Sequence, residues 1–212
     1  MDAVGEFLKA CEHANAQQVQ QMLPLWDTDP DFNIVCTQGA VMAAARKRWD
    51  TVLVLSPHVD VSVADFILVR TTCAHQQWNC MKELTKNLGP SNARLILEHV
   101  SSSLFASDAS DIFMGVFNQA YTPPHIPSLF TLANNAVKVG AFSCLDAIIN
   151  RVGMPKNLLA DLVDYANMVN FRQKEFGAVL IENLQNFEGW KQKKRLEQAL
   201  GELPPTLRSR KL

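Results

Sequence analysis

One arrangement of residues recurs along this chain at intervals of about 31 residues, and it restricts the possible folds more than any other feature. Each copy has a pair of mostly small residues, a short polar break, and then an anchor residue that opens an apolar stripe three and six positions further on. The anchors are Ala16, Trp49, Trp78, Phe142 and, with a weaker stripe, Phe171. They are separated by 33, 29, 64 and 29 residues.

The step of 64 residues equals two periods, so the pattern predicts one more unit with an anchor near Ile112 or Phe113. A period of this length is too long for one helix and too short for a domain, but it suits a helix–turn–helix unit that stacks on its neighbours. Small residues let two helix backbones approach, and the stripe after the anchor is the buried face of the second helix. The sequence therefore predicts an all-α fold, an α-solenoid of about six such units, with Trp49 and Trp78 in the core.

Two of these units resemble the ankyrin repeat. Residues 43–52 are similar to its Ala-Ala-x-x-Gly-His-Leu-Glu-Val-Val core, and residues 136–145 match better because Gly140 stands at the inter-helix glycine. Residues 58–62 are similar to the Gly-Ala-Asp-Val-Asn finger that follows the second helix. The Thr-Pro-Leu-His opening is absent and the glycine occurs only once, so a more general solenoid of helix pairs stays open. The resemblance covers most of residues 5–185 and implies an ankyrin-like solenoid that binds proteins.

The pattern also predicts how the chain is divided. We expect a single repeat domain over residues 1–202 and a flexible basic tail over 203–212. Its units are predicted near 2–30, 36–62, 64–90, 93–125, 128–155 and 156–186, with a polar capping helix at 189–200. Serine and aspartate at 101–111 predict a loop with a helix start, and prolines make 122–127 irregular. Apolar and polar residues alternate over 59–63 as in a β-strand. This segment is either a finger loop or one arm of a short hairpin, and an α/β fold is therefore the alternative to the all-α fold.

Composition excludes several classes of function. The chain carries 20 basic and 21 acidic residues, so it has no bulk attraction for nucleic acid or an anionic membrane. No apolar run approaches the roughly 18 residues of a membrane span, and the N-terminus lacks the pattern of a secretory signal. The five cysteines are irregularly spaced, which predicts reduced, mostly buried thiols and a cytoplasmic protein. They are Cys11, Cys36, Cys73, Cys80 and Cys144.

The pattern Cys-x-His occurs at Cys11–His13 and again at Cys73–His75, close to Cys80. Residues two apart on a helix point about 200° away from each other, so they do not chelate one ion, and we predict core cysteines with surface histidines and no metal. The sequence contains no recognisable hydrolase, metalloprotease or phosphate-binding motif, and we predict no cofactor. A cysteine-dependent enzyme on a helical scaffold and a self-assembling structural subunit remain the alternative functions.

The repeat register, read with the resemblance, nominates exposed positions on the first helices and turns as the binding site. In ankyrin proteins such positions commonly carry recognition of a protein partner, in adaptors or in microbial effectors that act inside a host cell. The nominated residues are His13, Arg46, Arg48, His75, Gln77, Asn134 and Lys138. Residues 46–48 form either a basic contact for an acidic partner or a solvated turn. The basic C-terminus is diluted by glutamates, so we expect no nucleic-acid binding there.

Overall fold

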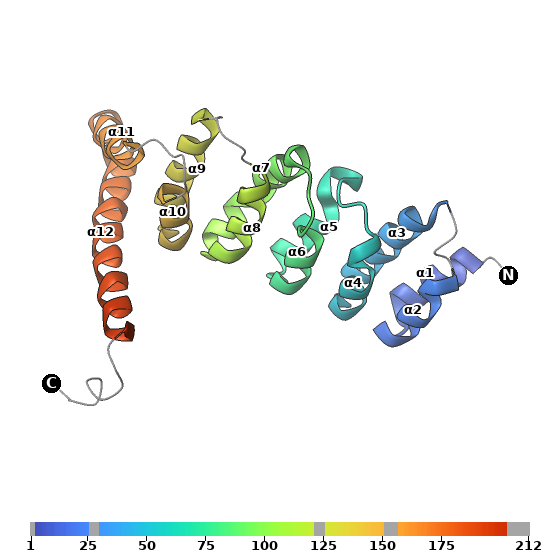
Figure 1. Cartoon of the computed structure of the whole chain (residues 1–212). Helices are drawn as coiled ribbons and strands as arrows, with labels where there is room; N and C mark the ends of the chain where they lie inside the picture. The colour runs from blue at the N-terminus through green and yellow to red at the C-terminus, as the bar shows by residue number, and fades with distance from the viewer. Residues whose placement is uncertain (1–2, 26–29, 121–125, 151–156, 203–212) are drawn as a thin grey trace. The chain divides into compact units, whose positions relative to one another are not determined.

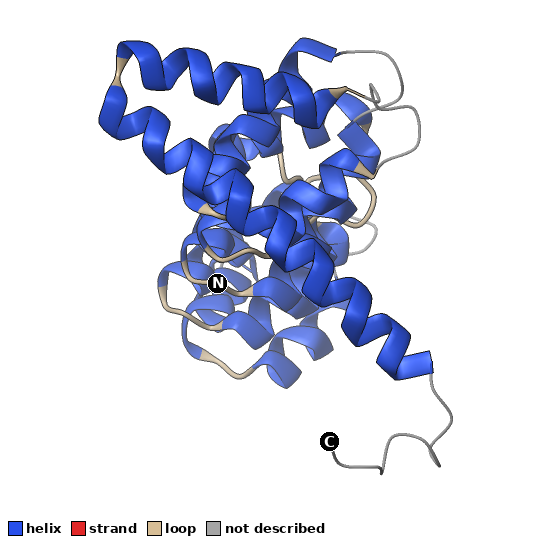
Figure 2. Cartoon of the chain, turned by 90° about the vertical axis from the view of Figure 1, so that its left-hand side faces the viewer, coloured by secondary structure: helices blue, strands red, loops and turns tan. Residues whose placement is uncertain are grey.

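The computed structural model describes residues 3–25, 30–120, 126–150 and 157–202, and in these ranges the chain forms helices and turns without any strand (Figure 2). This confirms the all-α class. The alternating segment at 59–63 is a turn rather than a strand. Its shape is fixed by polar contacts: the Asp60 N–H donates to Thr37 Oγ1 over 2.9 Å, and the Asp60 carboxylate accepts from the Ser62 N–H and hydroxyl.

The described residues fall into two compact units, of which the first comprises residues up to Leu104 together with 109–120. Its helices come in pairs that follow one another in the order of the sequence (Figure 1). They are α1 (Ala3–His13), α2 (Ala16–Met22), η1 (Leu23–Leu25), α3 (Phe32–Ala45), α4 (Trp49–Leu55), η2 (Ser56–His58), α5 (Val63–Ala74), α6 (Trp78–Leu84), α7 (Pro90–Ala106) and α8 (Ser110–Ala120).

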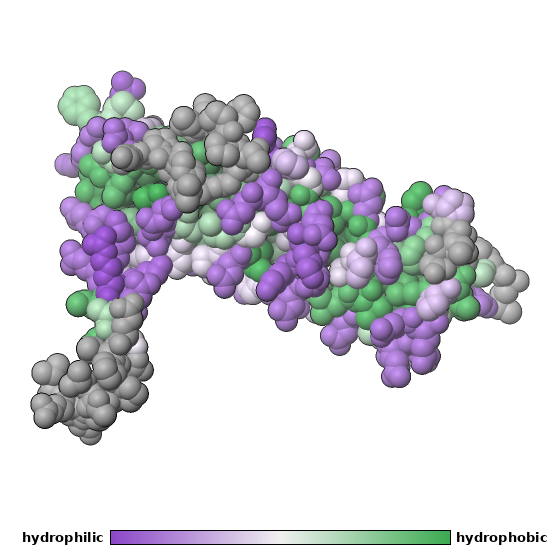
Figure 3. Space-filling model, viewed as in Figure 1, coloured by the Kyte–Doolittle hydropathy of each residue, from purple (hydrophilic) through white to green (hydrophobic). Residues whose placement is uncertain are grey.

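The second unit comprises residues 105–108 and the described residues from 126 onward. It holds α9 (Ile126–Val139), α10 (Phe142–Ile149), α11 (Leu158–Arg172) and α12 (Lys174–Glu202). α11 and α12 form a hairpin, and α12 extends beyond the end of α11 (Figure 2). Asp108, in the turn after α7, accepts the N–H groups of Ser143 and Cys144 and so caps α10. Figure 3 shows hydrophilic residues along the exposed side of α12, with hydrophobic ones near its end.

The predicted anchors locate the second helices. Ala16, Trp49, Trp78 and Phe142 are the first residues of α2, α4, α6 and α10. Because each stripe begins at the anchor, its buried members follow at the expected spacing, as with Val52 and Leu55 in α4. The two tryptophans themselves are only half-buried, because each sits at the edge of a turn.

One predicted anchor is approximate and another is wrong. The additional helix pair is present, and its second helix begins at Ser110, two residues before Ile112. Phe171 opens no helix: it lies near the end of α11 with 92% of its surface exposed, and α12 begins at Lys174. Its stripe was weak in the sequence because it does not face the core.

Close approach explains the small residues on the first helices. Ala43 and Ala44 are buried in α3, where this helix packs on α1 and α4. A Cβ atom on Gly39 would stand 2.7 Å from the Cys11 sulfur, so α1 and α3 meet at a distance that only glycine allows. The expectation that small side chains mark helix contacts is confirmed for this pair.

Two predicted boundaries do not form. The segment at 101–111 was expected to be a loop with a helix start. The helix start is confirmed by α8 at Ser110, but α7 continues through the expected loop to Ala106, because Val100, Ser101 and Leu104 continue its buried face. A separate capping helix at 189–200 was expected, but α12 runs unbroken from Lys174 to Glu202, since a helix interior tolerates Gly189 at a cost of about 1 kcal/mol. The predicted tail at 203–212 and most of the irregular stretch at 122–127 lie outside the described residues; Ile126 and Pro127 begin α9.

Candidate functional site

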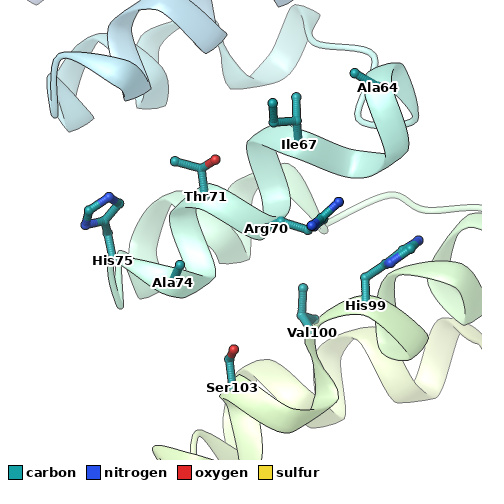
Figure 4. A pocket seen from close by; sticks show the side chains of 9 residues that line it. All are labelled: Ala64, Ile67, Arg70, Thr71, Ala74, His75, His99, Val100 and Ser103. Atoms are coloured by element: carbon teal, nitrogen blue, oxygen red, sulfur yellow. The ribbon is translucent and has the colours of Figure 1, made fainter.

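The first helices of the third and fourth pairs enclose a groove of about 510 Å³ (Figure 4). We call it the α5–α7 groove. Its lining residues are Ala64, Ile67, Arg70, Thr71, Ala74 and His75 from α5 and its C-cap, and His99, Val100 and Ser103 from α7. All of them lie in the first unit.

Helical spacing explains why α5 lines the groove with one face and the core with the other. Residues three and four apart share a face of a helix, and Ile67, Arg70, Thr71 and Ala74 follow this spacing. Val63 and Asp65 at the start of α5 are exposed, and the other five residues are buried in the core. These five are Phe66, Leu68, Val69, Thr72 and Cys73.

The residues that line the groove include basic side chains and no acidic ones. Arg70 and His99 reach into the groove from opposite helices, and His75 closes one end. Arg70 is exposed and forms no ion pair with any other described residue. Both imidazoles are held by aromatic neighbours.

Those aromatic contacts fix the direction of each imidazole. The His75 ring lies 5.4 Å from the indole of Trp49, and the His99 ring lies 5.9 Å from the Phe66 ring. Because both partners are themselves buried or half-buried, the imidazoles are presented from a packed support. A side chain held this way loses little rotational freedom when it binds a ligand.

A strained turn forms the rim of the groove. Ala64, Asp65 and Phe66 all have positive φ, at 50°, 52° and 59°, which is the left-handed helical conformation. For residues other than glycine this costs roughly 1–2 kcal/mol each. Strain of this kind persists where surrounding contacts hold it, and it concentrates at functional sites. Here the turn sets Ala64 and Ile67 on the groove and Phe66 against His99.

A second cleft, of about 430 Å³, lies where the turns of the first three pairs meet, and we call it the turn cleft. It is lined by Asn15, Ala16, Lys47, Arg48, Trp49, Asp50, Thr51 and Gln77. The Nε–H of Arg48 is buried and donates to no described atom. A buried donor without an acceptor costs about 1–3 kcal/mol. Trp49 lines this cleft and also contacts His75, so the cleft adjoins the α5–α7 groove.

Three of the seven nominated residues come together. His75 lines the α5–α7 groove, while Arg48 and Gln77 line the turn cleft next to it. Two more lie at the adjoining end of α1. The Arg46 guanidinium donates two hydrogen bonds to Glu12 Oε1, which lowers the pKa of that carboxyl, and His13 stands 3.5 Å from Glu12 Oε2.

The last two nominated residues lie in the second unit. Asn134 was expected to be exposed, and this is wrong: it is 8% exposed, because α9 packs against α10, α11 and α12 and little of its circumference is free. Lys138 is half-buried, with its Nζ 3.4 Å from Asn135 Oδ1 and 5.4 Å from the centre of the Phe176 ring.

The groove residues Ile67, Arg70, His99 and Ser103 were missed. Arg70 and Ile67 lie two and five residues before Thr72, the first residue of the small pair of the third unit, so the register could have found them. His99 and Ser103 could not be placed, because the fourth unit was located only approximately.

The cysteines offer no reactive thiol. All five are buried, as predicted for most of them. Burial raises the pKa of Cys11 to about 12, that of Cys36 to about 11 and that of Cys80 to about 11, and it also raises the pKa of Cys73 and Cys144. Nucleophilic cysteines have lowered pKa values and some exposure, which is the opposite environment.

The described ranges contain no group of three or more histidine, cysteine or acidic side chains arranged to hold a metal ion. None of the helices there combines the length and the apolar character needed to cross a membrane. Comparison with models of protein families, with curated proteins and with solved structures finds no match to this chain.

Proposed function

We propose that the chain is a protein-binding module, an ankyrin-like α-solenoid that holds a segment of a partner in the α5–α7 groove. The observation that carries the proposal is the groove itself: it has a volume of about 510 Å³, it is open to solvent, and all but two of its lining residues, Thr71 and Val100, are exposed. A recognition site in a stacked-helix protein forms on this kind of surface. Cytoplasmic adaptors and microbial effectors both use such modules, and either role fits.

The environment of the thiols favours binding over the cysteine-dependent alternative. A thiol nucleophile needs to ionise near neutral pH and to reach a substrate. The five cysteines here are buried and their pKa values are raised, so neither condition is met. The groove, in contrast, presents arginine, imidazole and hydroxyl groups together with apolar surface, which is the mixture found at protein interfaces.

The proposal is tested with two double variants of the full chain. The groove variant carries Arg70→Ala and His99→Ala, and the control carries Asn79→Ala and Lys82→Ala on α6, all at exposed positions. The wild type and the two variants are immobilised separately and exposed to lysate of the source cells, and the proteins that each retains are identified. We expect at least one protein that the wild type and the control retain and the groove variant does not. Identical sets from all three baits would refute the groove as the binding site.

A further inference from the structure

We propose that the partner segment is acidic: a carboxylate of the partner lies between Arg70 and His99, and an aliphatic side chain beside it packs on Ile67. This rests on the proposed function, since it names the chemistry of the segment that the α5–α7 groove takes. Arg70 is the permanent charge of the groove, and an exposed guanidinium pairs with carboxylates through two parallel hydrogen bonds.

The distribution of acidic residues around the groove supports this choice. Asp65 and Glu98 are each adjacent in sequence to a lining residue, yet neither lines the groove. Arg70 therefore has no carboxylate partner within the described chain, and one from the partner would provide it. Complementary charge of this kind sets specificity and speeds association.

The turn cleft extends the basic surface. Lys47 and Arg48 line it with Asp50 as the one carboxylate of the lining, and the Trp49–His75 contact joins it to the groove. A segment that begins in the groove and continues past His75 thus meets further positive charge.

The apolar lining selects a peptide over other polyanions. Ala64, Ile67 and Ala74 supply an aliphatic strip along α5, and Ile67 is 40% exposed. A nucleic-acid site would instead need a run of phosphate contacts and aromatic platforms, and none of the groove residues is aromatic apart from the two histidines. The net charge of −1 also gives the chain no general affinity for polyanions.

A random twelve-residue peptide library displayed on phage is the probe. It is selected on the full wild-type chain, and enriched peptides are synthesised with a fluorescent label for anisotropy measurements. We expect enrichment of aspartate and glutamate over the unselected library. Binding should weaken at least about tenfold in Arg70→Glu and stay unchanged in Lys82→Glu, an exposed charge reversal on α6. Peptides with the critical acid replaced by lysine should regain binding to Arg70→Glu.

The outcomes separate the two proposals. One contrary outcome is a set of selected peptides that lack acidic residues, bind Ile67→Ser weakly and bind Arg70→Glu as tightly as the wild type. That result would overturn the acidic partner but would leave the proposed binding module intact. A library without any peptide sensitive to Ile67, Arg70 or His99 would overturn both. A single-stranded oligonucleotide or an anionic vesicle that binds through Arg70 where acidic peptides do not would also overturn the acidic segment. Circular dichroism of every variant confirms that the helices are intact.

Discussion

At the scale of single residues, one backbone conformation recurs inside the helix pairs. Lys47, Gln76, Asp108 and Gly140 each precede the first residue of a second helix by two positions, and their φ angles are 58°, 54°, 44° and 71°. Only glycine adopts this left-handed conformation without a penalty. Lys47, Gln76 and Asp108 thus have the backbone conformation of Gly140, although none of the three is a glycine.

This position predicts stabilising substitutions. Lys47→Gly and Gln76→Gly should each raise the free energy of unfolding by about 0.5–1 kcal/mol, because the relieved strain exceeds the extra entropy that glycine gives the unfolded chain. Gly140→Ala should lower it by a similar amount through the backbone alone, since the added Cβ meets nothing closer than 3.8 Å. Urea unfolding measures all three. Lys82→Gly, inside helix α6, is the control and should destabilise by about 1 kcal/mol; a Lys47→Gly variant that loses as much would contradict the argument.

The buried thiols predict how stability depends on pH. An unfolded cysteine ionises near its ordinary pKa of 9.0, whereas Cys36 stays protonated until about 11 and Cys11 until about 12. Above pH 9 the unfolded state therefore releases protons that the folded state keeps, so stability falls as pH rises from 9 to 12. Thermal unfolding at pH 8 and pH 10.5 measures the loss. It should be smaller in Cys36→Ala, and an equal loss would show that other groups cause it.

At the scale of secondary-structure elements, contact between α11 and α12 depends on one glycine. A Cβ atom on Gly177 would overlap the backbone of Asn170, so one of the two helices would have to move. Gly189 lies further along α12, where an added Cβ meets no atom within 4 Å. Within α12, Gly177 therefore allows a close helix contact, whereas Gly189 makes no such contact and only lowers the helix propensity.

Two alanine substitutions separate these roles. Gly177→Ala should destabilise the chain by about 2–3 kcal/mol, because overpacking forces α11 and α12 apart. Gly189→Ala should stabilise by up to about 1 kcal/mol through helix propensity. Chemical denaturation followed by circular dichroism gives both values. If both variants gain stability, the close approach at Asn170 does not exist in solution.

Sequence periodicity located elements where each anchor has a buried stripe behind it, as at Trp49 and Trp78. It failed where the stripe is interrupted: Phe171 is exposed, and the serines of α7 hide a buried helical face. The candidate site was predictable only in part for the same reason. His75 could be placed from its own repeat, but His99 lines the same groove from α7, and assigning both to one site requires the alignment of neighbouring units in space.

At the scale of the whole molecule, the pairs of each unit contact mainly their neighbours along the chain, such as α1 with α3 and α3 with α5. Specific hydrogen bonds join neighbouring pairs. Gln119 of α8 accepts from the Leu88 N–H and donates to the Thr85 carbonyl, and Asn183 of α12 donates to the Val137 carbonyl at the end of α9. In an array of stacked pairs, the free energy of unfolding is a sum of terms from each pair and its neighbours. A destabilising substitution therefore lowers the stability of its own pair most.

Hydrogen exchange measured by mass spectrometry tests this locality. Phe7 is buried in the first pair, and Phe7→Ala should cost about 3–5 kcal/mol there. We expect the amides of α1 to α4 to exchange faster, while those of α11 and α12 keep their wild-type rates, because in stacked pairs a loss of packing acts mainly on the neighbouring helices. Leu184→Ala, in the buried face of α12, should give the reverse pattern. If either variant accelerates exchange equally in all helices, the chain unfolds as one cooperative body, and the additive description of stacked pairs is wrong.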